Sequence, residues 1–188
     1  MADVTDSKSV GGDTVWVQVP PPAPERHGGF FRETCCVFCV DDKGRIRSVS
    51  VMNILVIDGQ GGQLGGQLVK AITAKFPGIE LTSVGTNAVA TTAMVKAGAK
   101  RAATGENPII VASRKADVII GPVGIVIADS LFGEITPDAA KAVGQSAAVK
   151  ILIPINKCEN LVAGVNNLSF SALIDDVLLK LSEIVERR

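Results

Sequence analysis

Strand and helix patterns alternate along the chain from residue 52 onward. Apolar or β-branched runs at 54–57, 79–84, 100–104, 117–120 and 150–154 are typical of β-strands, and a sixth strand is predicted at 160–165. Helical patterns occupy 62–75, 88–97, 107–113 and 136–146. Strands that alternate with helices build parallel sheets. The order therefore predicts a three-layer α/β fold, with an open, mainly parallel sheet of five to six strands and helices on both faces.

Helix boundaries are marked by residues that favour caps. Thr86 or Asn87 precedes the second helix, Gly98 follows it, Asn107 with Pro108 opens the third, and Thr136 opens the fourth. Ser169 opens a terminal helix with a stripe formed by Leu173, Val177, Leu181 and Ile184. Such a stripe predicts packing on the sheet, with a homodimer contact as the alternative.

Residues 1–51 have a different character. They hold Trp16, His27 and the proline-rich run 20–24, and they show neither the helical nor the strand periodicity of apolar residues over any sustained length. We expect a disordered N-terminal extension at 1–51 and one folded domain at 52–188, and Met52 is our hypothesis for the natural start. Cys36 and Cys39 form a C-x-x-C without a second pair, so no metal site is predicted.

Glycines crowd the junction between the first strand and the first helix. Gly59, Gly62 and Gly65 fit G-x-x-G-x-x-G, the variant seen in extended short-chain dehydrogenases, but not G-x-G-x-x-G or a Walker phosphate loop. A strand, a glycine turn and a helix in this order make half of a Rossmann-like nucleotide-binding unit. The helix N-terminus there favours a phosphate. The alternative is a turn kept for tight strand–helix packing.

Polar residues follow the other predicted strands as well, whereas the turns that lead into strands lack such a concentration of polar residues. Because the carboxyl ends of parallel strands share one sheet edge, we expect one site there. Asp58 and Glu106 are candidates for acid, base or metal-ligand roles, and Lys157 for a phosphate contact, with loop hydrogen bonds or solvated charges as alternatives. The predicted ligand-binding residues are Asp58, Gly59, Gln60, Gly61, Gly62, Gly65, Thr86, Asn87, Gly105, Glu106, Asn107, Gly121, Pro122, Gly124, Asn156 and Lys157.

Composition narrows the class of protein. The 188 residues carry a formal net charge of zero and no basic stripe, which argues against nucleic acid as a partner. The longest apolar run, 118–131, is short and interrupted, so no membrane span is expected. Three of the four cysteines lie in the first forty residues, which suggests no disulfide framework and favours a cytoplasmic protein.

Several segments together resemble one known family. They are 52–62 (MNILVIDGQGG), 85–87 (GTN), 104–108 (TGENP), 121–126 (GPVGIV), 144–146 (GQS) and 154–158 (PINKC). In this combination the chain resembles, from residue 52 to about 185, an uncharacterised bacterial family known as domain of unknown function 3842. The resemblance implies a Rossmann-like fold and a start at Met52, with no established activity. Gln63 replaces a glycine and Gly66 a basic residue of the family's usual turn, so a cation beside the turn is lost.

These observations favour a small domain that binds a nucleotide or another phosphate-bearing molecule, and leave open whether it catalyses a reaction. An NAD(P)-dependent oxidoreductase or epimerase is the alternative, but NAD(P) is disfavoured. No Asp or Glu ends the second strand, the chain has no tyrosine, and residues 52–188 have no histidine. Cys158 is a candidate nucleophile or a buried thiol. A third possibility is a non-catalytic regulatory subunit that uses the terminal helix and 123–132 as an interface.

Overall fold

The computed structural model describes residues 52–155, 162 and 169–187, together with the backbone of three N-terminal strands. The chain forms two compact units, Met1–Val51 and Met52–Arg188. In the first unit, β1 (Trp16–Val17), β2 (Cys36–Val40) and β3 (Ile46–Ser50) pair as an antiparallel sheet in the order β1-β2-β3. These strands lie in the region for which the sequence predicts a disordered extension.

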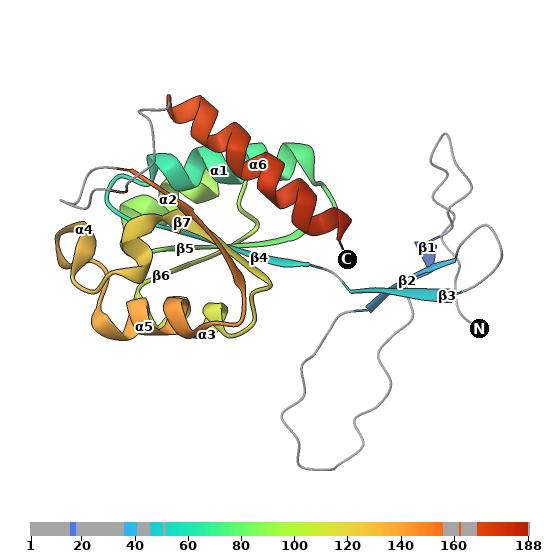
Figure 1. Ribbon diagram of the computed structural model, residues 1–188, viewed down its shortest axis with the longest axis horizontal. Helices are drawn as coiled ribbons and strands as arrows, with labels where there is room; N and C mark the ends of the chain where they lie inside the picture. Colours follow the sequence, from blue (N-terminus) through green and yellow to red (C-terminus); the bar gives the residue numbers. More distant parts are fainter. Residues whose placement is uncertain are drawn as a thin grey trace, which may run out of the picture. The chain divides into compact units, whose positions relative to one another are not determined.

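The second unit is built on a parallel sheet of five strands, as the fold prediction requires (Figure 1). The strands are β4 (Asn53–Asp58), β5 (Glu80–Gly85), β6 (Arg101–Thr104), β7 (Val118–Pro122) and β8 (Val149–Ile153). Their spatial order is β6-β5-β4-β7-β8, and every pairing is parallel. The predicted sixth strand lies outside the described residues, apart from Val162, which is not in a strand.

Strand order reverses at the central strand β4. From β4 the chain first adds β5 and β6 on one side, and then crosses to add β7 and β8 on the other. In open α/β sheets, ligands bind beside the carboxyl ends of the strands at such a reversal. In this topology a ligand is therefore expected at the end of β4, where the glycine turn begins.

Helices cover both faces of the sheet (Figure 1). One face packs on α1 (Gln63–Lys75), α2 (Ala88–Lys96) and α6 (Phe170–Glu186), and the other on α3 (Glu106–Ser113) and α5 (Pro137–Gln145). Residues of β4 alternate between the two cores, so Ile54 and Val56 face α1 while Leu55 and Ile57 face the opposite layer. Because helices cover both faces of the sheet, the side chains on both sides of β4 are buried, and this explains the unbroken apolar sequence of the strand.

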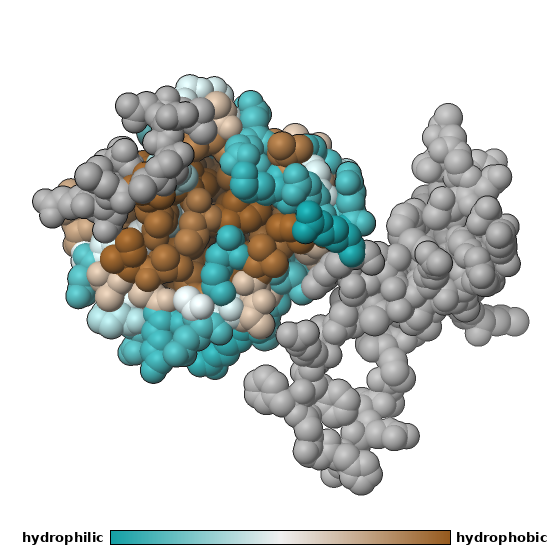
Figure 2. All heavy atoms as spheres, in the orientation of Figure 1, coloured by the Kyte–Doolittle hydropathy of each residue, from teal (hydrophilic) through white to brown (hydrophobic). Residues whose placement is uncertain are grey.

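The terminal helix packs on the sheet as predicted. Val177 and Leu181 are buried in the core beside α1, and Leu173 and Ile184 are partly buried against it. Figure 2 shows hydrophobic residues at the surface between α6 and α5, where β8 forms an edge of the sheet. Val149 at the start of β8 is 50% exposed there.

Most helix caps agree with the sequence, and one does not. The side chains of Asn87, Thr136 and Ser169 accept hydrogen bonds from backbone N–H groups in the first turns of α2, α5 and α6. The start predicted for α3 at Asn107 and Pro108 is wrong, because α3 begins at Glu106 with Gly105 as its N-cap. Gly105 has φ of 101° and its N–H donates to the carbonyl of Gly85 (2.8 Å), so the chain turns directly from β6 into the helix.

Candidate ligand-binding site

The turn after β4 is tied together by the carboxylate of Asp58. This buried group accepts hydrogen bonds from the N–H of Gly59 (2.9 Å) and from the N–H of Gly65 in α1 (2.6 Å). Gly62, the N-cap of α1, has φ of 68°, and a Cβ there would lie 2.5 Å from Cα of Ala90 in α2. Asp58 and Gly62 therefore hold the turn closed against its neighbours, which is the packing role that the sequence left as an alternative.

The loop after β5 lies beside this turn. The N–H of Thr86 donates to the carbonyl of Asp58 (3.0 Å). Asn87 caps α2 through its Oδ1, which accepts from the N–H of Ala90 (2.9 Å), and its Nδ2 donates to the carbonyl of Gln60 (3.0 Å). The ends of two neighbouring strands are thus joined by hydrogen bonds into one corner.

The donors of this corner converge on the carboxylate of Glu134. It accepts hydrogen bonds from the backbone N–H of Gln60 (2.8 Å), the hydroxyl of Thr86 and the Nδ2 of Asn87 (3.1 Å). A Cβ on Gly59 would lie 2.7 Å from Oε2 of Glu134, so the absence of a side chain at Gly59 makes room for the carboxylate. The group held in this corner is therefore an anion, and it is a carboxylate of the chain itself.

Hydrogen bonding keeps this carboxylate ionised. Burial raises the pKa of Glu134, but the hydrogen bonds from Thr86, the N–H of Gln60 and Asn87 together outweigh burial, so the pKa lies below its ordinary value of 4.5. A carboxylate with a lowered pKa is a weak base near neutral pH. Glu134 therefore functions here as a hydrogen-bond acceptor, and the donors around it stabilise negative charge.

Sequence reasoning missed Glu134 because it belongs to the connection between β7 and α5. That connection, residues 123–136, is longer than the roughly two to six residues usual in α/β units. It contains η1 (Val123–Val126) and α4 (Ser130–Gly133), and it returns to the end of β4. The unusual length of this connection is the feature of the sequence that could have indicated a role for it.

The segment that carries Glu134 has an unusual backbone. Asp129, Leu131, Phe132 and Gly133 all have positive φ, between 55° and 82°. For a residue other than glycine, such a conformation costs on the order of 1–3 kcal/mol. Phe132 is 93% exposed, whereas Leu131 and Ile135 are buried. The segment is thus held by burial of Leu131 and Ile135, and the hydrogen bonds of Glu134 contribute to keeping it in place.

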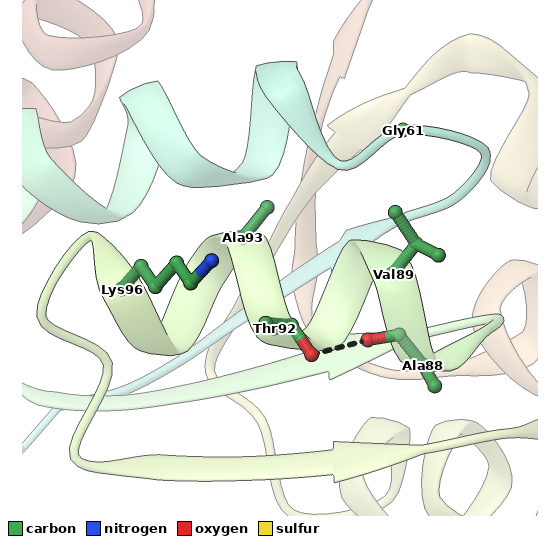
Figure 3. A pocket seen from close by; sticks show the side chains of 6 residues that line it. All are labelled: Gly61, Ala88, Val89, Thr92, Ala93 and Lys96. Atoms are coloured by element: carbon green, nitrogen blue, oxygen red, sulfur yellow. Dashed lines mark hydrogen bonds between the residues drawn. The ribbon is translucent and has the colours of Figure 1, made fainter.

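A surface groove begins at the same turn. It has a volume of about 390 Å³ and is lined by Gly61 and by residues of α2, namely Ala88, Val89, Thr92, Ala93 and Lys96. Figure 3 shows Val89 and Ala93 pointing from α2 toward α1 and the turn that carries Gly61. Val89 is 64% exposed. The hydroxyl of Thr92 donates to the carbonyl of Ala88 (2.7 Å), which leaves a mainly apolar groove with the Lys96 ammonium on one side.

The other predicted site residues lie elsewhere. Gly105, Glu106 and Asn107 begin α3 after β6, one strand beyond β5, and both Glu106 and Asn107 are exposed. On the opposite side of β4, Gly121 and Pro122 end β7 and Gly124 lies in η1, all buried. A Cβ on Gly121 would lie 2.4 Å from the carbonyl oxygen of Ile57, which indicates close packing of backbones. Asn156 and Lys157 lie outside the described residues.

Neither a metal-binding cluster nor a membrane-spanning helix is found in the described part of the chain. No group of three or more His, Cys, Asp or Glu side chains lies together there as a metal site would need. Nor does any helix in that part have both the length and the apolar character to cross a membrane.

Strand order, the reversal at β4 and the glycine turn together define a Rossmann-like domain. The chain belongs to the family described as Domain of unknown function (DUF3842), whose model matches residues 53–186. This membership agrees with the resemblance seen in the sequence. No curated protein matches the chain.

Solved structures offer distant likenesses. A dodecameric FMN-dependent Ubix-like decarboxylase from Escherichia coli O157:H7 is 20% identical, and the match covers 70% of this chain and 75% of that one, with a TM-score of 0.36. An arsenate reductase in the intermediate state is 14% identical over 73% of this chain and 95% of that one, with a TM-score of 0.28. Both likenesses are too remote to bear on function.

Proposed function

We propose that this domain binds a small molecule with a phosphate group, such as a nucleotide, at the corner formed by the turn after β4 and the loop after β5. The observation that carries the proposal is the convergence of the Gln60 N–H, the Thr86 hydroxyl and the Asn87 amide on one carboxylate. Donors that hold a carboxylate suit the oxygens of a phosphate equally well. The position at the strand reversal supports the same assignment.

The groove beside Gly61 is suited to the rest of such a ligand. Its volume of about 390 Å³ falls within the range of roughly 300–1,000 Å³ typical of small-molecule sites. Val89 and the alanines of α2 offer apolar surface for a ring, and Lys96 offers a cation for a second anionic group. Nε2 of Gln60, which is buried without an acceptor among the described residues, is a further donor at the same turn.

Binding is better supported than proton-transfer chemistry. Both oxygens of Asp58 accept N–H groups of the turn, and the lowered pKa of Glu134 makes it a poor general base. The oxidoreductase alternative needs a Tyr-x-x-x-Lys pair, and the chain contains no tyrosine. We therefore propose a ligand-binding domain and assign no catalytic residue.

The proposal is tested by isothermal titration of the full chain with inorganic phosphate and a panel of nucleotides. Wild type and Glu134→Ala are titrated in parallel, since the carboxylate occupies part of the site. In the Glu134→Ala background, where the hydroxyl of Thr86 is free to bind a ligand, Thr86→Val should weaken binding by about tenfold, the effect of losing roughly 1.4 kcal/mol. Thr73→Val is the matched control, because that hydroxyl bonds only within α1. If neither wild type nor Glu134→Ala binds inorganic phosphate or any nucleotide of the panel at millimolar concentration, the proposed function is wrong.

A further inference from the structure

We infer that Glu134 is a built-in competitor for the ligand's anionic group, and that a ligand binds only after this carboxylate has left the corner. The inference rests on the proposed function and adds how the site is regulated. Its basis is positional: the three donors that would recognise the ligand are the same three that Glu134 engages.

The carboxylate and a bound phosphate cannot share the corner. The Gln60 N–H and the Thr86 hydroxyl each have one hydrogen to donate, and both donate it to Oε2 of Glu134. The buried carboxylate of Asp58 lies in the same turn. A phosphate there would add a third negative charge, which both carboxylates would repel. Departure of Glu134 removes one of the two charges and frees the donors together.

The local structure permits that departure. Glu134 is only partly buried, so its carboxylate can reach water by rotation of its side chain and a small movement of the backbone. The exposed Gly133, with φ of 82°, precedes it, and the left-handed Leu131 and Phe132 lie one turn earlier. Residues of this kind store strain that a movement can relieve.

Both ends of the segment are anchored, whereas Phe132 and Gly133 in its middle are exposed. The hydroxyl of Ser130 donates to the carbonyl of Gly124 (2.5 Å), and Ile135 is fully buried in the core beneath α5. Phe132 between them is almost wholly exposed, so its side chain does not resist a change of conformation. The expected movement is therefore confined to 132–134 and leaves the core and the sheet unchanged.

The experiment compares affinities for inorganic phosphate and AMP in three variants of the full chain. Glu134→Ala removes the competitor, and Glu134→Gln keeps its shape but removes its charge. Glu186→Ala, an exposed position at the end of α6, is the control for the loss of one negative charge. Because apparent affinity scales with the fraction of open sites, a corner that is open one-tenth of the time predicts about tenfold tighter binding in Glu134→Ala. Glu134→Gln should tighten binding in the same direction, and Glu186→Ala should not.

A second measurement follows the segment itself. Hydrogen exchange of wild type should show faster exchange at 132–134 on adding AMP, with slower exchange at the N–H of Gln60. Equal affinities for wild type and Glu134→Ala would overturn the inference while leaving the proposed function in place. Weaker binding by Glu134→Ala would also overturn it, since Glu134 would then be part of the ligand's site. Absence of binding in every variant would remove the proposed function and this inference with it.

Discussion

Replacing Gly59 by alanine tests whether this position is a glycine in order to admit Glu134. The added methyl carbon would lie 2.7 Å from Oε2 of Glu134, 2.8 Å from Oγ1 of Thr86 and 3.0 Å from Cδ1 of Leu131. Real side chains do not tolerate the two shortest contacts, so either the neighbours shift or the carboxylate leaves. Overpacking of this size costs about 1–3 kcal/mol, and loss of a hydrogen bond to a charged group costs about 1.5–3 kcal/mol. Since these are alternative outcomes, we expect Gly59→Ala to lower the free energy of unfolding by about 1–3 kcal/mol.

The assay is urea-induced unfolding followed by circular dichroism, because every helix in the described part of the chain lies in the second unit. Gly61→Ala is the matched control. A Cβ at Gly61 meets nothing within 4 Å, so that variant should be within about 0.5 kcal/mol of wild type or slightly more stable.

A double-mutant cycle identifies the neighbour responsible. If the methyl group at position 59 acts by expelling the carboxylate, Glu134→Ala should cost less in the Gly59→Ala background than in wild type. A coupling of about 1 kcal/mol or more is expected for groups in contact. Stability equal to that of Gly61→Ala, or additive effects within about 0.5 kcal/mol, would refute the reasoning.

Three other predictions concern the hydrogen bonds of Glu134, the cap of α2 and the packing of α6. Because the pKa of Glu134 is depressed in the folded protein, the stability that its ionised carboxylate contributes should be fully present above about pH 4.5 and be lost as the pH falls through the lower folded value. The difference in unfolding free energy between wild type and Glu134→Gln, measured against pH, should therefore disappear in acid. A difference that grows in acid would contradict this. Asn87→Ala should destabilise the domain more than the roughly 1 kcal/mol expected for Ser169→Ala in urea titrations, because Asn87 caps α2 and also holds Glu134 and Gln60, whereas Ser169 caps α6. Leu181→Ala should cost about 2–5 kcal/mol by thermal or urea unfolding, since Leu181 is 0% exposed, while Leu179→Ala, at 58% exposure, should change stability by less than about 0.5 kcal/mol; equal effects would mean that α6 does not pack as described.

Local patterns were sufficient for the framework of this protein. Alternation of apolar runs with helical patterns predicted the parallel sheet and its two covering layers, because burial on both faces requires continuous apolar strands. The glycine turn and the caps at Asn87, Thr136 and Ser169 were also readable, since each depends on bonds that span only a few residues. The start of α3 was misplaced because the hydrogen bond from Gly105 to Gly85, across two strands, determines it.

The occupant of the candidate site was decided by tertiary structure alone. Gln60, Thr86 and Asn87 were predicted at the sheet edge, but Glu134 lies 74, 48 and 47 residues away from them along the chain. No periodicity links positions so distant, and only the path of the 123–136 connection brings the carboxylate to the donors. A sequence determines which backbone groups a strand end will expose. The tertiary structure determines which group binds them, because that depends on where a long connection returns to the sheet.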